Sequence, residues 1–122
     1  MRSLWLAAGA LLCALALGGG AFGAHALAER LDPRALGLWE TAARYLMYAG
    51  LGLALVGIAG RQAPRAELQL AAPVLFLGAL LFSGSLLGLA LGGPSWLGVL
   101  TPIGGVLQIA ALLLVAWSAW RG

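Results

Sequence analysis

LQLAAPVLFLGALLFSGSLLGLALGGPSWLGVLTPIGGVLQIAALLLVAWSAW, residues 68–120, is the stretch that decides the fold of this chain. Its 53 residues include no aspartate, glutamate, lysine or arginine. A helix needs about 20 apolar residues to cross a hydrocarbon layer of about 30 Å, so the stretch is too long for one span and fits two. Gly92, Gly93 and Pro94 interrupt it, and these residue types end helices. We therefore expect membrane helices over about residues 68–91 and 97–120.

Two more apolar runs precede this stretch. Residues 3–28 carry no charged side chain, which fits one span. Residues 45–60 are also uncharged, and the small or aromatic residues just upstream extend the run to about residue 40. Arg44 can reach the lipid headgroups with its long side chain. Membrane β-strands alternate apolar and polar residues, whereas these runs are continuous, so the sequence predicts an all-α, polytopic four-helix bundle.

The composition of the whole chain agrees with a membrane protein. Hydrophobic residues make up 62% of the 122 residues and charged residues only 9%, against about 25% in a soluble domain. These values exclude a soluble globule, which needs a polar surface, and a disordered chain, which is highly charged. Cys13 is the single cysteine, so a disulfide scaffold is excluded. The chain has no basic stripe, so we expect no nucleic-acid partner. Membrane lipids are the partners that the composition predicts.

The first loop is the only sizeable polar segment. Asp32 followed by Pro33 is a typical helix start, with a carboxylate N-cap and a proline in the first turn. Apolar residues then recur at helical spacing up to Ala42. The pattern predicts a short amphipathic helix at the membrane interface, between the first two spans and running on into the second.

Arginine counting predicts the orientation in the membrane. Four arginines fall on the side of the two termini: Arg2, Arg61, Arg65 and Arg121. Arg30 and Arg34 fall on the other side, with Arg44 near it. The excess places both termini in the cytoplasm of a multi-pass cell-membrane protein. The first span resembles a signal peptide in outline, but its apolar run is longer than a signal core, so we expect it to be retained.

Small residues indicate where the helices pack, because close backbone approach replaces hydrophobic attraction in lipid. Each span has small residues that can form such a contact: Gly19 and Gly23 are four residues apart, as are Gly84 and Gly88, and Gly104 and Gly105 are adjacent. The residues selected for helix packing are Gly19, Gly23, Gly84, Gly104 and Gly105.

A few polar residues within or near the spans are candidates for binding or chemistry: His25, Glu40, Arg44, Tyr45, Ser83 and Gln108. Each also has a structural interpretation. The single histidine can fix the first loop, Glu40 and Arg44 have the spacing of an i, i+4 ion pair, and serine or glutamine can join helices by hydrogen bonds. The functional interpretation is a polar cluster that binds a small or lipid-like molecule.

The sequence contains no motif for a metal, a cofactor or a known catalytic mechanism. A zinc site needs several ligands, and His25 has no second histidine and no cysteine nearby. No HExxH, GxSxG or phosphate-binding loop is present. We therefore expect no metal, no cofactor and no enzyme activity, although His25 with Glu40 and the tyrosines leaves acid–base chemistry on a lipid as a third hypothesis.

Four ordered motifs suggest a family: GAFGAHAL at 20–27, WETAARY at 39–45, LFSGS at 81–85 and TPIGG at 101–105. With these motifs, the chain resembles the domain-of-unknown-function 423 family, the transmembrane protein 256-like proteins, over essentially its whole length. The resemblance implies a small four-helix membrane protein and no established reaction. Relatives commonly carry a histidine shortly after the tyrosine of the second motif, where this chain has Ala49. This difference weakens any metal or proton-relay role for His25.

Two functions remain open. The first is a non-enzymatic accessory or structural membrane component, with a second copy or another membrane protein as its partner. The alternative is a binder or translocator of a small or lipid-like molecule through the polar cluster near His25.

Overall fold

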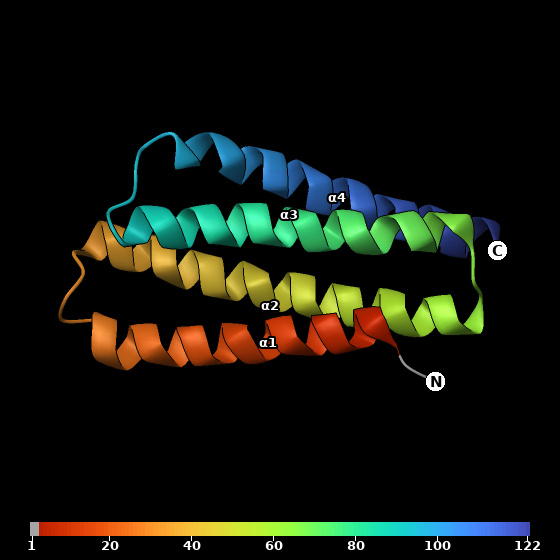
Figure 1. Ribbon diagram of the computed structural model, residues 1–122, viewed down its shortest axis with the longest axis horizontal. Coiled ribbons are helices and arrows are strands. Elements are labelled where there is room, and N and C mark those ends of the chain that lie inside the picture. Colours follow the sequence, from red (N-terminus) through yellow and green to blue (C-terminus); the bar gives the residue numbers. More distant parts are fainter. Residues whose placement is uncertain (1–2) are drawn as a thin grey trace.

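The computed structural model describes residues 3–122, which form four long helices and no strand. Helix α1 (Leu4–Phe22) continues into a short π-helix, η1 (Gly23–Leu27), and is followed by α2 (Pro33–Gln62), α3 (Ala66–Ala90) and α4 (Leu97–Arg121) (Figure 1). All four are long and apolar enough to cross a membrane. The prediction of an all-α, four-helix membrane protein is confirmed.

The amphipathic segment after the first loop is the beginning of α2 itself. The Asp32 carboxylate accepts a hydrogen bond of 2.8 Å from the backbone N–H of Ala35, and Pro33 follows as the first helical residue. The helix then runs without a break through 30 residues, or about 45 Å at 1.5 Å per residue. The expected interfacial helix therefore runs on into the second span as its first turns, and the structure places no separate helix there.

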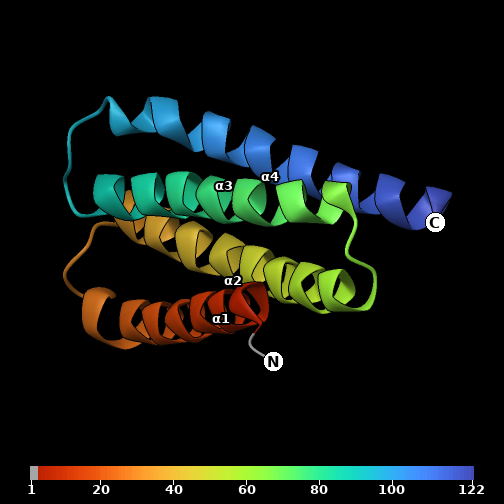
Figure 2. The ribbon, with the colours of Figure 1, turned by 45° about the vertical axis from the view of Figure 1, so that its right-hand side comes forward.

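Helices α2 and α3 form the centre of the bundle. Helix α1 packs mainly against α2, and α4 packs mainly against α3, so α1 and α4 lie on opposite sides of the central pair (Figures 1 and 2). The most deeply buried large side chains, Leu53 and Leu75, come from the two central helices. The outer faces of α1 and α4 are apolar and exposed, as expected where lipid covers the protein.

Glycines bring the backbones of each hairpin into contact. A Cβ atom added at Gly9 of α1 would lie 2.6 Å from the carbonyl oxygen of Gly50 in α2. In the second hairpin, a Cβ atom at Gly104 would lie 2.7 Å from the carbonyl oxygen of Gly78 and would overlap the backbone nitrogen of Phe82. Neither position has room for a side chain, so close approach depends on glycine here.

The predicted packing glycines divide into two groups. Gly104 lies in the hairpin contact, Gly23 lies under the indole ring of Trp39, and a Cβ atom at Gly105 would be 3.6 Å from the Phe82 ring. The prediction is wrong for Gly84, which borders a groove and where an added Cβ would meet no atom within 4 Å. Gly19 also has open space beside it and borders the same groove, but its carbonyl oxygen accepts a hydrogen bond from Trp39 of α2.

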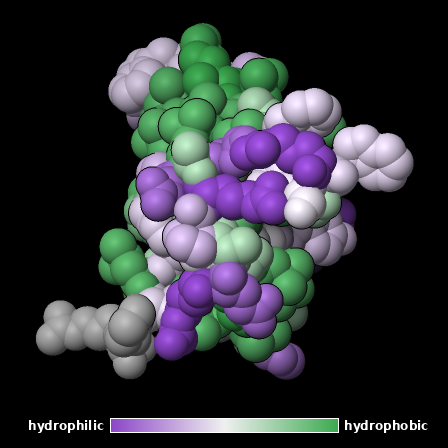
Figure 3. Space-filling model, turned by 90° about the vertical axis from the view of Figure 1, so that its right-hand side faces the viewer, coloured by the Kyte–Doolittle hydropathy of each residue, from purple (hydrophilic) through white to green (hydrophobic). Residues whose placement is uncertain are grey.

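Hydrophilic side chains gather at the end of the bundle that carries the α2–α3 turn and the end of α4 (Figure 3). Arg61, Arg65, Glu67 and Arg121 belong to these segments. Arg30 and Arg34 lie at the opposite end, in and beside the α1–α2 loop. Arg2, which contributed to the arginine count, lies outside the described residues.

Candidate functional site

The six candidate polar residues do not form one cluster. His25 lies in η1, at the loop end of α1, and its side chain is exposed. Tyr45 and Gln108 lie together on the opposite side of α2, where that helix faces α4. Because α2 and α3 separate α1 from α4, His25 cannot join these residues, and the expected pocket near His25 is corrected on this point.

Glu40 and Arg44 are both exposed on α2. Within residues 3–122, neither side chain makes a hydrogen bond or an ion pair, so the predicted i, i+4 pair is absent from the structure. An exposed i, i+4 ion pair stabilises a helix by only about 0.3–0.5 kcal/mol. This gain is too small to hold two long side chains in a single conformation.

Ser83 joins the two central helices. Its hydroxyl is buried and donates a 2.9 Å hydrogen bond to the carbonyl oxygen of Ala42 in α2. It also lies at the wall of an almost entirely apolar groove of about 520 Å³ between α1, α2 and α3. Because its proton is committed to the Ala42 carbonyl, Ser83 acts here as a helix–helix contact.

Gln108 joins the second hairpin. Its side-chain nitrogen donates hydrogen bonds to the carbonyl oxygens of Gly78 in α3, at 3.3 Å, and of Gly104 in α4, at 3.4 Å. A glutamine at this depth needs a hydrogen-bond partner on a neighbouring helix, and for Gln108 this partner is Gly78. Sequence reasoning did not select Gly78.

An aromatic groove of about 360 Å³ lies beside Gln108, between α2 and α4. The ring of Tyr45 lies 5.2 Å from that of Tyr48, edge to face, and 5.3 Å from that of Phe82. Both tyrosines are exposed, so their rings form the open wall of the groove. This groove brings together two of the predicted site residues and adds Phe82 and Tyr48.

Trp39 fastens the end of α1 to α2. Its indole N–H donates a 2.7 Å hydrogen bond to the carbonyl oxygen of Gly19, and its ring covers Gly23 and lies 6.2 Å from that of Phe22. A Cβ atom at Gly23 would be 2.5 Å from the indole ring. The first two sequence motifs therefore meet in space, a contact that their positions in the chain did not reveal.

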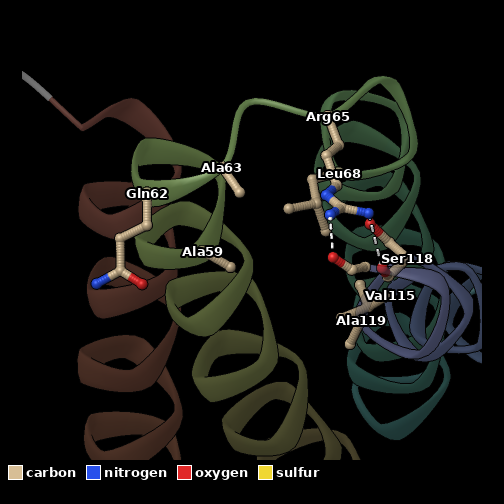
Figure 4. Close-up of a pocket in the computed structure, with 9 residues that line it drawn as sticks. Ala59, Gln62, Ala63, Arg65, Leu68, Val115, Ser118 and Ala119 are labelled. Atoms are coloured by element: carbon tan, nitrogen blue, oxygen red, sulfur yellow. Dashed lines mark hydrogen bonds between the residues drawn. The ribbon is translucent and has the colours of Figure 1, made fainter.

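Further polar contacts tie the beginning of α3 to the end of α4. The Arg65 guanidinium donates hydrogen bonds of 3.1 Å to the carbonyl oxygens of Ser118 and Gly122, beside a pocket of about 290 Å³ (Figure 4). Arg121 forms an ion pair with Glu67 in the first turn of α3. A cation at a helix C-terminus and a carboxylate near an N-terminus are both favoured by the helix dipoles. The sequence analysis did not predict these contacts of Arg65, Arg121 and Glu67. Two antiparallel helices place the residue before one span beside the residue after the other, and this rule could have indicated them.

No group of three histidine, cysteine, aspartate or glutamate side chains in residues 3–122 lies close enough to hold a metal ion.

Comparison with known proteins agrees with this architecture. A family model described as "Protein of unknown function (DUF423)" matches residues 19–105. A UPF0382 membrane protein of Staphylococcus haemolyticus is 42% identical over 118 residues, which cover 97% of this chain and 96% of the relative. The UPF0382 membrane protein YwdK of Bacillus subtilis is 38% identical over 112 residues, 91% of each chain. No solved structure matches at a significant level.

Proposed function

Because this chain belongs to the DUF423 family of membrane proteins, whose function is unknown, we propose a role from its own geometry: a non-enzymatic structural or accessory component of the membrane. The observation that carries the proposal is the use of the polar groups inside the spans. Ser83, Gln108 and Trp39 all donate to backbone carbonyls of a neighbouring helix. Their protons serve the assembly of the bundle, while the exposed side chains of α2 remain available to a partner.

We test this role by crosslinking in intact cells, followed by capture through a tag at the C-terminus. A structural component should be recovered in a crosslinked product of constant stoichiometry, with itself or with one other membrane protein. Recovery of the monomer alone contradicts the role.

The same tag tests the orientation in the membrane that the arginines favour. Arg61, Arg65 and Arg121 lie at the end of the bundle that holds the C-terminus, so we expect this end in the cytoplasm. In sealed right-side-out vesicles the tag should resist external protease. Digestion of the tag would contradict the predicted orientation.

The aromatic groove supports a second candidate, the binding of a lipid-like molecule. Three aromatic rings and the Gln108 amide lie around about 360 Å³ that opens to the outside of the bundle, within the spans. Aromatic walls with one polar group are typical of sites for small apolar ligands.

Native mass spectrometry from mild detergent tests the groove. We expect the wild-type protein to retain a lipid adduct and Phe82→Ala to lose at least fivefold of it, because that ring closes the groove between α2 and α4. Leu17→Ala removes an exposed apolar side chain from α1, far from the groove, and should keep the adduct. Equal adduct in both variants would show that the groove holds no specific lipid.

A further inference from the structure

Most of the side chains that α2 exposes within its span lie in one narrow stripe; Tyr45, which lines the aromatic groove, lies outside it. Six of them follow each other at spacings of three or four residues: Glu40, Arg44, Tyr48, Leu51, Leu55 and Ile58. At 100° per residue they occupy about 80° of the circumference of the helix. The stripe is narrow because α1, α3 and α4 cover the other faces of α2, where Gly50, Leu53 and Gly52 lie.

From Tyr48 to Ile58 the spacing is 3, 4 and 3, the repeat by which two helices interlock side chains along a seam. Leu51, Leu55 and Ile58 are each more than two-fifths exposed although they are large and apolar. Lipid would cover these three equally well, so the apolar part of the stripe does not identify its occupant.

The charged part of the stripe identifies the occupant. The uncharged run of α2 ends at Arg61, and a hydrocarbon layer of about 20 residues measured back from there reaches residue 42. Arg44 therefore lies at the edge of the hydrocarbon, and Glu40 lies one turn further out. Both side chains are exposed, and within residues 3–122 neither makes a hydrogen bond or an ion pair, so both charges are available to a partner of opposite charge.

We propose that the α2 stripe binds the α2 stripe of a second copy of this chain, with Glu40 of each copy paired to Arg44 of the other. One stripe carries both signs of charge, and the long Arg44 side chain can extend towards the headgroups to the level of Glu40, one turn further out. A two-fold axis along the membrane normal sets the two α2 helices parallel and makes the ion pair twice. The apolar residues below the charges then pack against their own counterparts. The inference rests on the proposed structural role and names the partner for it.

Cysteine crosslinking in membranes tests the stripe. Cys13 is the one cysteine of the chain, so Cys13→Ala gives a cysteine-free background. In that background, Leu51→Cys should give a covalent dimer with copper phenanthroline. Leu11→Cys is the matched control, because it lies at a similar depth on the exposed face of α1, 60% exposed against 53% for Leu51. We expect at least fivefold more dimer from Leu51→Cys, and equal yields would overturn the proposal.

Charge exchange tests the pairing in the Leu51→Cys protein, with equal amounts of each variant in the membrane. Glu40→Arg and Arg44→Glu should each lower the dimer yield at least fivefold, since like charges then face each other. The double variant restores opposite signs and should recover at least half of the yield. Unchanged single variants, or a double variant that stays low, would overturn the pairing. If residue 51 crosslinks only to a different membrane protein, the second copy is excluded while the structural role stands.

Discussion

Gly104→Ala should lower the free energy of unfolding by about 2–3 kcal/mol, the range in which forced overpacking of a tight contact costs stability. The added Cβ would lie 2.7 Å from the carbonyl oxygen of Gly78 and would overlap the backbone nitrogen of Phe82. Backbone atoms cannot rotate away as a side chain can, so α3 and α4 must separate. The separation also lengthens the hydrogen bond from Gln108 of α4 to the carbonyl oxygen of Gly78 in α3.

Gly98→Ala is the matched control for this contact. Gly98 lies in the same helix, and an added Cβ there would meet no atom within 4 Å. Alanine should leave the stability unchanged or raise it by up to about 1 kcal/mol through its helix propensity. Unfolding of both variants by rising sodium dodecyl sulfate in mixed micelles, followed by circular dichroism, gives the comparison. Equal midpoints would mean that the two helices can move apart at no cost.

Trp39→Ala should lower the free energy of unfolding by about 3 kcal/mol, as large aromatic truncations do in packed interiors. The substitution removes the indole ring that covers Gly23 and the hydrogen bond to the carbonyl of Gly19. Trp39→Phe keeps most of the ring and loses the hydrogen bond, for which we expect about 1 kcal/mol.

Trp96→Ala separates this effect from a general role of tryptophan at the membrane surface. Trp96 lies at the same end of the bundle, between α3 and α4, and is 62% exposed. It should cost much less than Trp39→Ala in the same unfolding experiment. If the two alanine variants lose the same stability, Trp39 acts as an interfacial anchor and not as the fastener of α1.

The four spans were predictable because lipid imposes a simple rule on sequence: about 20 uncharged residues for each crossing. The break at Gly92, Gly93 and Pro94 agrees with the gap between α3 and α4. The predicted span over about residues 40–60 is part of a longer helix, because Glu40 and Arg44 mark an edge of hydropathy but do not interrupt helical hydrogen bonding. The helix begins at Pro33, as the Asp32–Pro33 start predicts.

The candidate site was less predictable, because depth along a helix can be read from sequence and direction around the bundle cannot. His25 lies in the first family motif and Tyr45 in the second. In the structure, His25 is exposed at the end of α1, whereas Tyr45 faces α4. Gly19 and Gly104 were both predicted to pack against a neighbouring helix, and of the two only at Gly104 would an added Cβ meet a neighbouring backbone. The pairing of particular faces depends on the order of the helices in space, which no periodicity within one helix contains.

The placement of every helix beside its neighbour in the chain has a consequence for biogenesis. When α2 leaves the translocation machinery, α1 is already in the bilayer, and the contact of Gly9 with Gly50 can close at once. The same holds for α4 and α3 at Gly104. No span has to wait for a distant one, so the mainly local contact order allows the bundle to assemble in step with its synthesis.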